Sequence, residues 1–293
     1  MKYQSSIIFG EVLWDCFPDG NQVLGGAPFN VAWHLQAFSQ KPLFISRVGN
    51  DREGELILQA MQDWGMTTEG VQIDPNLGTG IVTVSLKNGQ PSYSIEHPKA
   101  YDHINVNLFP NFSDSALLYH GSLAIRNDVS KRSLIELKNR SQRTIFCDVN
   151  FRDPWWQIEN LQPFLQDSTW LKLNNEELPA LVPNLVDRDR QLDFLFNEYD
   201  LQYILLTEGA AGATLFELGG DRLTVAPDQS TQVVDTVGAG DAFCSIFLLG
   251  ILSNWPLART LKRAQTFASA IVGIQGATTT EKHFYQPFQD AWL

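Results

Sequence analysis

The most informative part of this chain is Asp235-Thr236-Val237-Gly238-Ala239-Gly240-Asp241, followed directly by the apolar run Ala242–Leu252. Two glycines in a short segment before a long apolar run predict a turn that opens a buried helix. The first N–H groups of such a helix have no partner inside it, and the helix dipole is positive at that end. The segment therefore predicts an anion site that can hold a transferring phosphoryl group.

Asp241 lies at the edge of this predicted anion site. A carboxylate in that place can accept the proton of an attacking hydroxyl group, an effect worth roughly 10²–10⁴ in rate. The alternative interpretation is a glycine turn in which the aspartate only caps the helix. An isolated GxGD motif would favour that alternative, whereas the whole seven-residue segment before a buried helix favours the catalytic interpretation.

Other motifs for phosphate binding or catalysis are absent from the sequence. No GxxxxGK[ST] loop occurs, and the GxGxxG that Gly238 and Gly240 begin has Phe243 in place of its last glycine. A dinucleotide-binding loop would also follow the first strand of a βαβ unit, whereas this segment lies near the C-terminus. The protein-kinase HRD and DFG motifs, GxSxG and HExxH are missing too. These common enzyme classes are thereby excluded.

Apolar strand-like stretches alternate with helix-like stretches along most of the chain. This pattern predicts an α/β fold with a mainly parallel central sheet. The expected strands are 6–13, 43–48, 116–120, 144–149, 169–173 and 203–207. The expected helices are 27–38, 53–64, 128–140, 188–199, 239–253 and 257–274. Pro28 suits the first turn of the first of these helices. We expect 239–253 and 257–274 to be the last two helices of the chain.

A hairpin interrupts this alternation. Residues 80–86 and 91–96 alternate polar and apolar side chains around Asn88-Gly89, which is a strong hairpin signal. We expect a small β-flap outside the main sheet, a lid built from strands within about 12–24 and 80–96. The sequence contains no repeat, low-complexity tract or linker, so a single domain over residues 1–293 is expected.

Composition narrows the possible partners and locations. The formal net charge is −12, from 21 Lys and Arg against 33 Asp and Glu, which repels nucleic acid but still permits local binding of a small anion. Three scattered cysteines, Cys16, Cys147 and Cys244, form no CxxC pair and suit a reducing compartment. Residues 1–6 show no signal-peptide pattern, and the apolar run 242–252 is too short to span a bilayer. We therefore expect a cytoplasmic protein that binds neither membrane nor nucleic acid.

The sequence resembles the ribokinase-like (PfkB) carbohydrate kinases over nearly its whole length. The 235–241 segment is similar to their DTxGAGD signature, and Gly25-Gly26-Ala27-Pro28-Phe29-Asn30-Val31-Ala32 is similar to their GGAPxNVA motif. The resemblance implies a three-layer α/β/α domain with a lid, and transfer of the γ-phosphate of Mg-ATP to a sugar hydroxyl. It also implies that Asp241 is the catalytic base, while the backbone of Gly238, Ala239 and Gly240 forms the anion hole.

The resemblance assigns further residues to the sugar and the nucleotide. It implies that the sugar is bound by Asp15, Gly25, Gly26 and Asn30. It implies that the nucleotide is bound by a TxGxxG motif, which supplies Thr207, Gly209 and Gly212. Gln265, on the adenine side, lies about where many members carry asparagine. Asn174 and Glu177 match an NxxE motif that organises Mg²⁺-bound water, although an exposed acidic helix start explains them equally well. Arg152 is expected to contact the sugar or the ATP phosphates, or else to form a surface ion pair.

A monovalent cation such as K⁺ is a further implication of the resemblance. Asp235 and the carbonyl group of Val237 lie where many members hold such an ion, and Gly276 and Thr280 are expected to complete its shell. In this family the flaps often pair between subunits, so we also expect a homodimer.

Several features resemble fructokinase-type members in particular, so fructose is the leading substrate. They are Glu11 after Gly10, the segment Gly121-Ser122-Leu123 before Arg126, and Asp148-Val149-Asn150-Phe151-Arg152. Ribose, a nucleoside and 2-keto-3-deoxygluconate remain alternative acceptors. A phosphosugar is less favoured because Lys99 and Arg126 are the only obvious basic groups for its phosphate. A different class of function is a non-catalytic sugar-binding or regulatory protein, which the presence of Asp241 disfavours.

Overall fold

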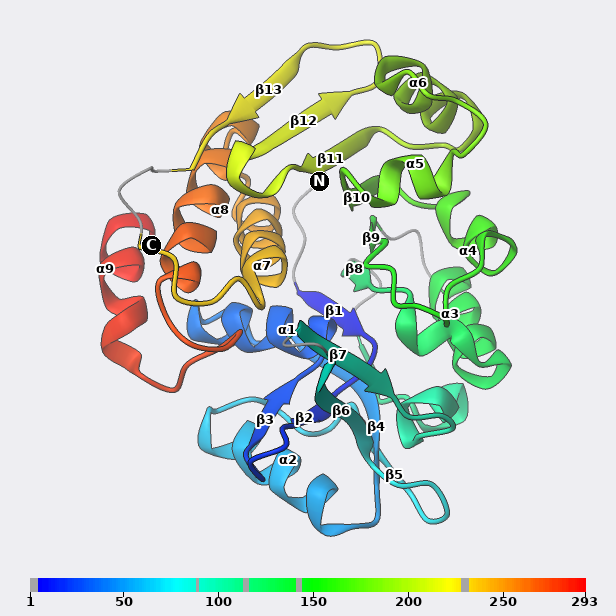
Figure 1. Ribbon diagram of the computed structural model, residues 1–293, viewed down its shortest axis with the longest axis vertical. Coiled ribbons are helices and arrows are strands. Elements are labelled where there is room, and N and C mark those ends of the chain that lie inside the picture. Colours follow the sequence, from blue (N-terminus) through cyan, green and yellow to red (C-terminus); the bar gives the residue numbers. More distant parts are fainter. Residues whose placement is uncertain (1–4, 88–89, 113–115, 141–143, 228–231) are drawn as a thin grey trace.

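The computed structural model describes residues 5–87, 90–112, 116–140, 144–227 and 232–293, which form two β-sheets with helices packed around the larger one (Figure 1). Within these residues the larger sheet has nine strands in the order β13-β12-β11-β10-β9-β8-β1-β4-β5. All neighbours from β11 to β5 run parallel, while β12 and β13 are antiparallel at one edge. The prediction of an α/β fold with a mainly parallel sheet is confirmed.

The strands of the larger sheet are β1 (Ser6–Phe9), β4 (Leu43–Gly49), β5 (Val71–Asp74), β8 (Leu117–His120), β9 (Ile145–Asp148), β10 (Trp170–Asn174), β11 (Tyr203–Thr207), β12 (Ala213–Glu217) and β13 (Arg222–Val225). The α-helices are α1 (Ala27–Ala37), α2 (Arg52–Asp63), α3 (Asp128–Asn139), α4 (Ile158–Leu165), α5 (Glu177–Leu181), α6 (Arg188–Glu198), α7 (Ala239–Leu252), α8 (Leu257–Val272) and α9 (Lys282–Trp292). Short 3₁₀ helices cover Ala100–His103, Val106–Leu108, Leu123–Arg126 and Gly209–Ala211.

Helices cover both faces of the larger sheet. Helices α1, α7, α8 and α9 lie on one side, and α3, α4, α5 and α6 lie on the other, with the strands between them (Figure 1). Helix α7 is buried on almost every side, and its Phe247 packs against Phe146 of β9 and Trp170 of β10. A helix that is apolar all round is stable only in such a fully covered position. Its N-terminus is therefore fixed relative to the strands.

The smaller sheet has the order β3-β2-β6-β7, with bounds β2 (Leu13–Cys16), β3 (Gln22–Gly25), β6 (Gly80–Lys87) and β7 (Gln90–Ile95). Strands β2 and β6 run parallel, and the other two pairs are antiparallel. The Asn88-Gly89 turn expected between β6 and β7 lies outside the described residues. The role of this sheet as a lid stays a prediction.

Two expectations about these elements are wrong. The strand expected at 6–13 is split, because the chain leaves β1 after Phe9 and enters the smaller sheet as β2. A Cβ atom on Gly10 would lie 2.3 Å from Cγ of Pro28, so α1 packs directly on the backbone where the two strands separate.

The helix at 257–274 is not the last one, because α9 follows it. Pro287 inside α9 conceals this helix in the sequence, since proline removes an internal hydrogen bond. Helix α4 is hidden in the same way by Pro163. Aromatic packing compensates in α9, where Phe288 meets Phe267 of α8 and Trp292 stacks on Phe38.

Three neighbouring parallel strands end on residues that carry polar groups. These residues are Asp148 of β9, Asn174 of β10 and Thr207 of β11. Because parallel strands present their carboxyl ends at the same edge, the three side chains lie along one rim of the sheet. No helix in the described part of the chain is both long and apolar enough to cross a membrane.

Candidate active site

The first turns of α1 and α7 meet through one side-chain hydrogen bond. Asn30 Nδ2 donates to Asp241 Oδ2 at 2.8 Å. Asn30 is almost completely buried, and its Oδ1 has no hydrogen-bond partner within the described residues. The contact brings together the two ends of the chain that carry the strongest sequence motifs. It orients the Asp241 carboxylate and leaves Oδ1 of that carboxylate free of this bond.

Gly238 makes the turn before α7 possible. Its φ is 76°, in the left-handed region, and a Cβ atom there would lie 2.3 Å from Cβ of Ala277. Both constraints require glycine. The Ala239 N–H donates to the Thr236 carbonyl oxygen at the long distance of 3.4 Å, so this predicted anion-hole donor is already partly engaged. The next N–H groups, of Gly240 and Asp241, belong to the helix's first turn, where no intrahelical partner exists.

Desolvation by the surrounding protein raises the pKa of Asp241 to about 6. The hydrogen bond from Asn30 and the positive charges of Lys172 and Arg152 act in the opposite direction, while Asp148 raises the pKa further. The carboxylate is therefore mostly ionised at neutral pH yet more basic than an ordinary aspartate. These are the properties that a general base needs near pH 7.

A buried ion pair lies beneath the start of α7. Lys172 Nζ donates to Asp148 Oδ1 at 2.9 Å, and Asp148 Oδ2 accepts from Tyr119 Oη at 3.0 Å and from Cys244 Sγ at 3.4 Å. A Cβ atom on Gly240 would lie 3.6 Å from the same Lys172 Nζ. This network ties strands β8, β9 and β10 to α7 and places a cation below the predicted anion site.

Lys172 is a candidate functional residue that sequence reasoning missed. In the sequence it is one residue of the expected strand 169–173, and a lysine there gives no indication of what it faces. The available signal is its position in an apolar strand, because a charged residue that is buried needs a partner of opposite charge.

The residues expected to bind the sugar surround the junction of β2, β3 and α1. A Cβ atom on Gly25 would lie 2.9 Å from Asp15 Oδ2, and one on Gly26 would lie 2.7 Å from the Glu11 carbonyl oxygen. Gly26 also has a φ of 109°, so both the conformation and the close approach exclude a larger side chain. The structure thus brings Asp15, Gly25, Gly26 and Asn30 into one region.

The carboxyl groups of this region have raised pKa values. Burial raises the pKa of Asp15 to about 6 and that of Glu11 to about 7. The positive charge of Arg152 lowers the pKa of both groups, and it also lowers that of Asp241. Arg152 is exposed and donates to the carbonyl oxygen of its neighbour Phe151 at 3.1 Å. Its charge therefore acts on all three carboxyl groups of the site.

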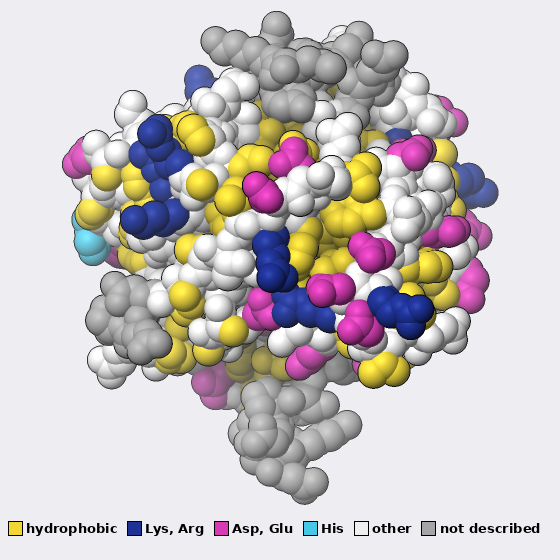
Figure 2. Space-filling model, turned by 90° about the horizontal axis from the view of Figure 1, so that it is seen from above, with side chains coloured by type: hydrophobic (Ala, Val, Ile, Leu, Met, Phe, Trp, Pro, Cys, Tyr) yellow, Lys and Arg dark blue, Asp and Glu magenta, His cyan; other side chains and the backbone are white. Residues whose placement is uncertain are grey.

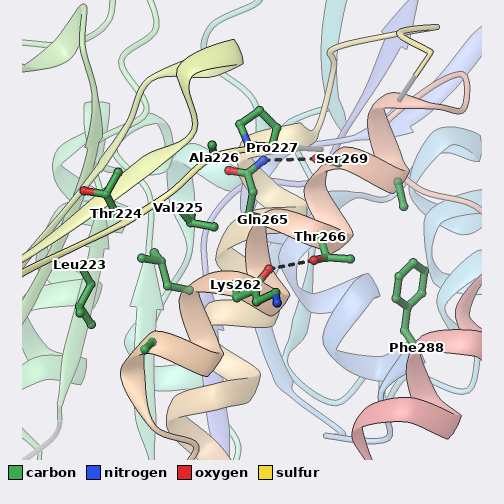
Figure 3. A pocket seen from close by; sticks show the side chains of 13 residues that line it. Leu223, Thr224, Val225, Ala226, Pro227, Lys262, Gln265, Thr266, Ser269 and Phe288 are labelled. Carbon is green, nitrogen blue, oxygen red and sulfur yellow. Dashed lines mark hydrogen bonds between the residues drawn. The ribbon is translucent and has the colours of Figure 1, made fainter. Parts of the chain in front are cut away.

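On the other side of α7, a groove of about 600 Å³ lies between β13 and α8 (Figure 3). Gln265 lines it and donates to Ser269 Oγ at 3.3 Å, while Val225, Ala226 and Pro227 form the facing wall. The residues of the TxGxxG motif lie nearby along the chain, between β11 and β12.

Gly212 ends the turn between β11 and β12. Its φ is 101°, and a Cβ atom there would lie 2.0 Å from the Val225 carbonyl oxygen, so only glycine fits. Thr207 ends β11, and Gly209 begins the short 3₁₀ helix that follows. The motif thus shapes the backbone next to the groove that Gln265 lines.

Asn174 and Glu177 bind the backbone around them. Glu177 accepts from the N–H groups of Phe151 and Asn174 at 2.9 and 2.8 Å, and Asn174 Oδ1 accepts from those of Glu176 and Glu177 at 2.8 and 2.9 Å. Burial raises the pKa of Glu177, against the positive charge of Lys172. Both side chains offer oxygen atoms, the ligand type that Mg²⁺ prefers, beside the rim of the sheet.

The predicted cation residues are only partly brought together. Asp235 accepts from the Val237 N–H through Oδ1 and from the Gly276 N–H through Oδ2, both at 3.0 Å. Thr280 is exposed, and within the described residues the side chain of Asp235 bonds to Val237 and Gly276 and not to Thr280. The same part of the chain contains no cluster of three His, Cys, Asp or Glu side chains suited to a metal ion.

Helix α1 also holds the loop that packs on Gly238. Trp33 Nε1 donates to the Thr279 carbonyl oxygen at 3.1 Å, and His34 Nε2 lies 3.0 Å from the carbonyl oxygen of Ala277. Since that carbonyl can only accept, the His34 Nε2 carries the proton. Burial lowers the pKa of His34 to about 4, so the ring is neutral. These bonds fix Ala277 against the turn.

A family model described as pfkB family carbohydrate kinase matches residues 9–283 of this chain. The chain belongs to this family. It is 28% identical to the fructokinase of Vibrio alginolyticus over 295 residues, which covers 94% of this chain and 92% of that protein.

Solved structures agree with this assignment of the fold. The fructokinase of Xylella fastidiosa with bound ATP has a TM-score of 0.84 and 24% sequence identity, and the match covers 98% of this chain and 99% of that one. The fructokinase of Vibrio cholerae O395 with bound fructose, ADP and calcium ion has a TM-score of 0.84 and 23% identity, covering 97% and 98%. The expected ribokinase-like fold is thereby confirmed.

The Lys172–Asp148 pair generates a stability prediction. Lys172→Met leaves Asp148 buried without its counter-charge, so we expect the free energy of unfolding to fall by about 3–5 kcal/mol in urea denaturation. The double variant Asp148→Asn/Lys172→Met removes both charges and should recover most of that loss. Equal losses in the single and double variants would show that the ion pair is not what stabilises this junction.

Proposed function

We propose that this pfkB-family kinase transfers the γ-phosphate of ATP to fructose, with Asp241 as the catalytic base. The observation that carries the proposal is the 2.8 Å hydrogen bond between Asn30 and Asp241 at the N-terminus of α7. It supports the proposal because the Asp241 carboxyl group, whose pKa is raised, lies at the helix N-terminus and contacts a residue expected to hold the sugar. Fructose is favoured as the acceptor because the named relatives with the same fold include fructokinases.

The transfer proceeds by in-line displacement with mostly electrostatic catalysis. Asp15 and Asn30, together with the close backbone of Gly25 and Gly26, hold the sugar so that one hydroxyl group faces the phosphorus. Asp241 accepts the proton of that hydroxyl through Oδ1, because Oδ2 is held by Asn30.

Backbone N–H groups and two cationic side chains stabilise the negative charge on the transferring phosphoryl group. The N–H groups of Gly240 and Asp241 bind its oxygen atoms at the positive end of α7, and the Lys172 ammonium adds a positive charge beneath them. Arg152 approaches the phosphates from the solvent side. Its positive charge also lowers the pKa of Asp241.

The nucleotide lies across the rim of the sheet. Its base enters the groove that Gln265 lines (Figure 3). The turn at Gly209 and Gly212 follows its phosphates. Asn174 and Glu177 are the oxygen-bearing residues that would hold Mg²⁺-bound water. Bound Mg²⁺ would neutralise charge on the β- and γ-phosphate oxygens.

The direct test measures ADP release from Mg-ATP with fructose, glucose, mannose, ribose, adenosine, 2-keto-3-deoxygluconate and fructose phosphates. We expect release with fructose. In Asp241→Asn, turnover should fall by roughly 10²–10⁴ while the fold and sugar binding persist, because an amide oxygen can still accept from Asn30.

Near-normal turnover by Asp241→Asn would refute the base assignment. Release with another sugar alone would keep the mechanism and replace the substrate. Sugar binding without ADP release from any acceptor would favour the non-catalytic alternative.

A monovalent cation belongs to the same proposal. Asp235 links the backbone at Val237 and Gly276 close to the turn before α7, and carbonyl and carboxylate oxygens are the ligand type that K⁺ takes. We expect turnover to fall when tetramethylammonium replaces potassium in the assay. Equal rates in the two salts would remove the cation from the mechanism.

A homodimer formed through the smaller sheet is supported by its exposed apolar side chains. Phe17 is 39% exposed, Val23 is 40% exposed and Tyr93 is 56% exposed, and strands β3 and β7 are the open edges. Pairing of two such sheets would cover both the side chains and the edges. We expect the mass of two chains in light scattering at micromolar concentration, which a monomer mass would contradict.

The charges of the surface disfavour binding of nucleic acid, while a cytoplasmic location stays a proposal from the scattered cysteines. On the face shown in Figure 2, Lys and Arg side chains form small, separated groups, with Asp and Glu close to several of them. Nucleic-acid binding relies on a continuous basic surface. The net charge of −12 acts in the same direction.

A further inference from the structure

Four buried polar atoms beside the sugar residues have no hydrogen-bond partner within the described part of the chain. They are Glu11 Oε2, Tyr101 Oη, Arg126 Nη1 and Trp155 Nε1. Glu11 is 2% exposed, Tyr101 is 0% exposed, and the side chain of Arg126 is 1% exposed. Buried polar atoms are nearly always paired, because leaving them unpaired costs folding free energy. Four unpaired polar atoms in one region therefore indicate a functional role, such as binding a ligand.

Arg126 is the centre of this group. Its guanidinium carbon lies 4.5 Å from the ring centroid of Trp155 and 5.1 Å from that of Tyr101. Two of its nitrogens bind protein, since Nε donates to Asp102 at 2.7 Å and Nη2 donates to Asp102 at 2.9 Å and to the Glu96 carbonyl oxygen at 2.7 Å. The guanidinium is thereby fixed in orientation, and Nη1 is the nitrogen that remains.

Glu11 connects the group to the reaction centre. The charges of Arg152, Asp241 and Arg126 all act on its carboxyl group. A Cβ atom on Gly80 would lie 2.8 Å both from Cε1 of Tyr101 and from Cβ of Leu13, so Tyr101 lies beside the segment that follows Glu11. The Glu11 carbonyl oxygen lies 2.7 Å from the position that a Cβ atom would take on Gly26. The group therefore adjoins Gly26, one of the residues expected to bind the sugar.

We propose that Glu11, Tyr101, Arg126 and Trp155 form a distal subsite that binds hydroxyl groups of the acceptor sugar remote from the hydroxyl that is phosphorylated. This inference rests on the proposed kinase function and makes the four residues determinants of sugar specificity. Asp241 and Asn30 hold the reacting end of the sugar, and the distal subsite recognises the other end.

The charges of the subsite select a neutral hydroxyl group over an acidic one. Asp102 already neutralises the Arg126 guanidinium through a two-pronged ion pair, and Glu11 adds an acceptor that requires a donor. A hydroxyl group can accept from Arg126 Nη1 and donate to Glu11 at the same time, whereas an ionised carboxylate or phosphate cannot donate. Tyr101 and Trp155 offer further donors for the remaining lone pairs.

Two conservative variants test the subsite. Tyr101→Phe and Trp155→Phe each remove a polar atom that has no protein partner while an aromatic ring is kept. We expect the KM and the Kd for fructose to rise by about 3–10-fold in each variant, with kcat within about twofold of the wild type. In Tyr101→Phe the midpoint of thermal unfolding should stay the same or rise, because the lost hydroxyl group makes no hydrogen bond within the described residues.

Matched controls are available in the same chain. Tyr203→Phe and Trp156→Phe remove polar atoms that hydrogen-bond to Glu217 at 3.1 Å and to Asp153 at 2.8 Å. Both controls should leave the KM and the Kd for fructose unchanged. A rise in Kd that is confined to the two subsite variants would support the proposal.

The outcomes also separate this inference from the proposed function. Turnover of fructose with unchanged KM and Kd in both subsite variants would overturn the subsite alone. Weaker fructose binding in the variants of a protein that releases no ADP would support the subsite while the kinase proposal fails. Tight binding of 2-keto-3-deoxygluconate that Tyr101→Phe and Trp155→Phe weaken, in a protein indifferent to fructose, would overturn the assignment to a neutral hydroxyl.

Discussion

The hydrogen bond between Asn30 and Asp241 joins residues 211 positions apart, and the geometry of the site depends on it. It can form only because α1 and α7 are both buried in the core and enter the same region at their N-terminal ends. The glycines beside it serve the same contact, since Gly26 and Gly238 both have left-handed conformations next to closely packed backbone. The residues expected to bind the sugar and those expected to bind the phosphate thus meet at one point of the fold.

Burial determines the pKa values of the carboxyl groups around Asn30 and Asp241. Glu11, Asp15 and Asp241 all have raised pKa values because the protein removes water from them, and the charge of Arg152 moderates each shift. A site crowded with carboxyl groups would repel a triphosphate if nothing offset their charge. Arg152 at the surface and the dipole of α7 act against that repulsion, whereas the charge of Lys172 is paired with that of Asp148. The proposed function requires these two features to attract an anion locally in a chain of strongly acidic composition.

The parts of the site that could be predicted from the sequence are those with a local physical signal. The glycine turn before α7 and the helix that opens with Ala27-Pro28 fall into this group, because conformation alone restricts which residues can occupy them. Lys172, the unpaired atoms of Tyr101 and Trp155, and the link from His34 to Ala277 could not be predicted, since each depends on contacts between segments far apart. Helix α9 was missed because Pro287 contradicts local helix propensity, which aromatic packing on Phe267 overrides.

Helix α1 carries Asn30, Trp33 and His34 on a single rigid element, and through them it contacts Asp241, Thr279 and Ala277. Any small displacement of this helix moves the base and the loop behind the anion turn in concert. The distance between Asp241 and the loop at Ala277 is therefore set by their bonds to one helix. It does not require every surrounding segment to be rigid.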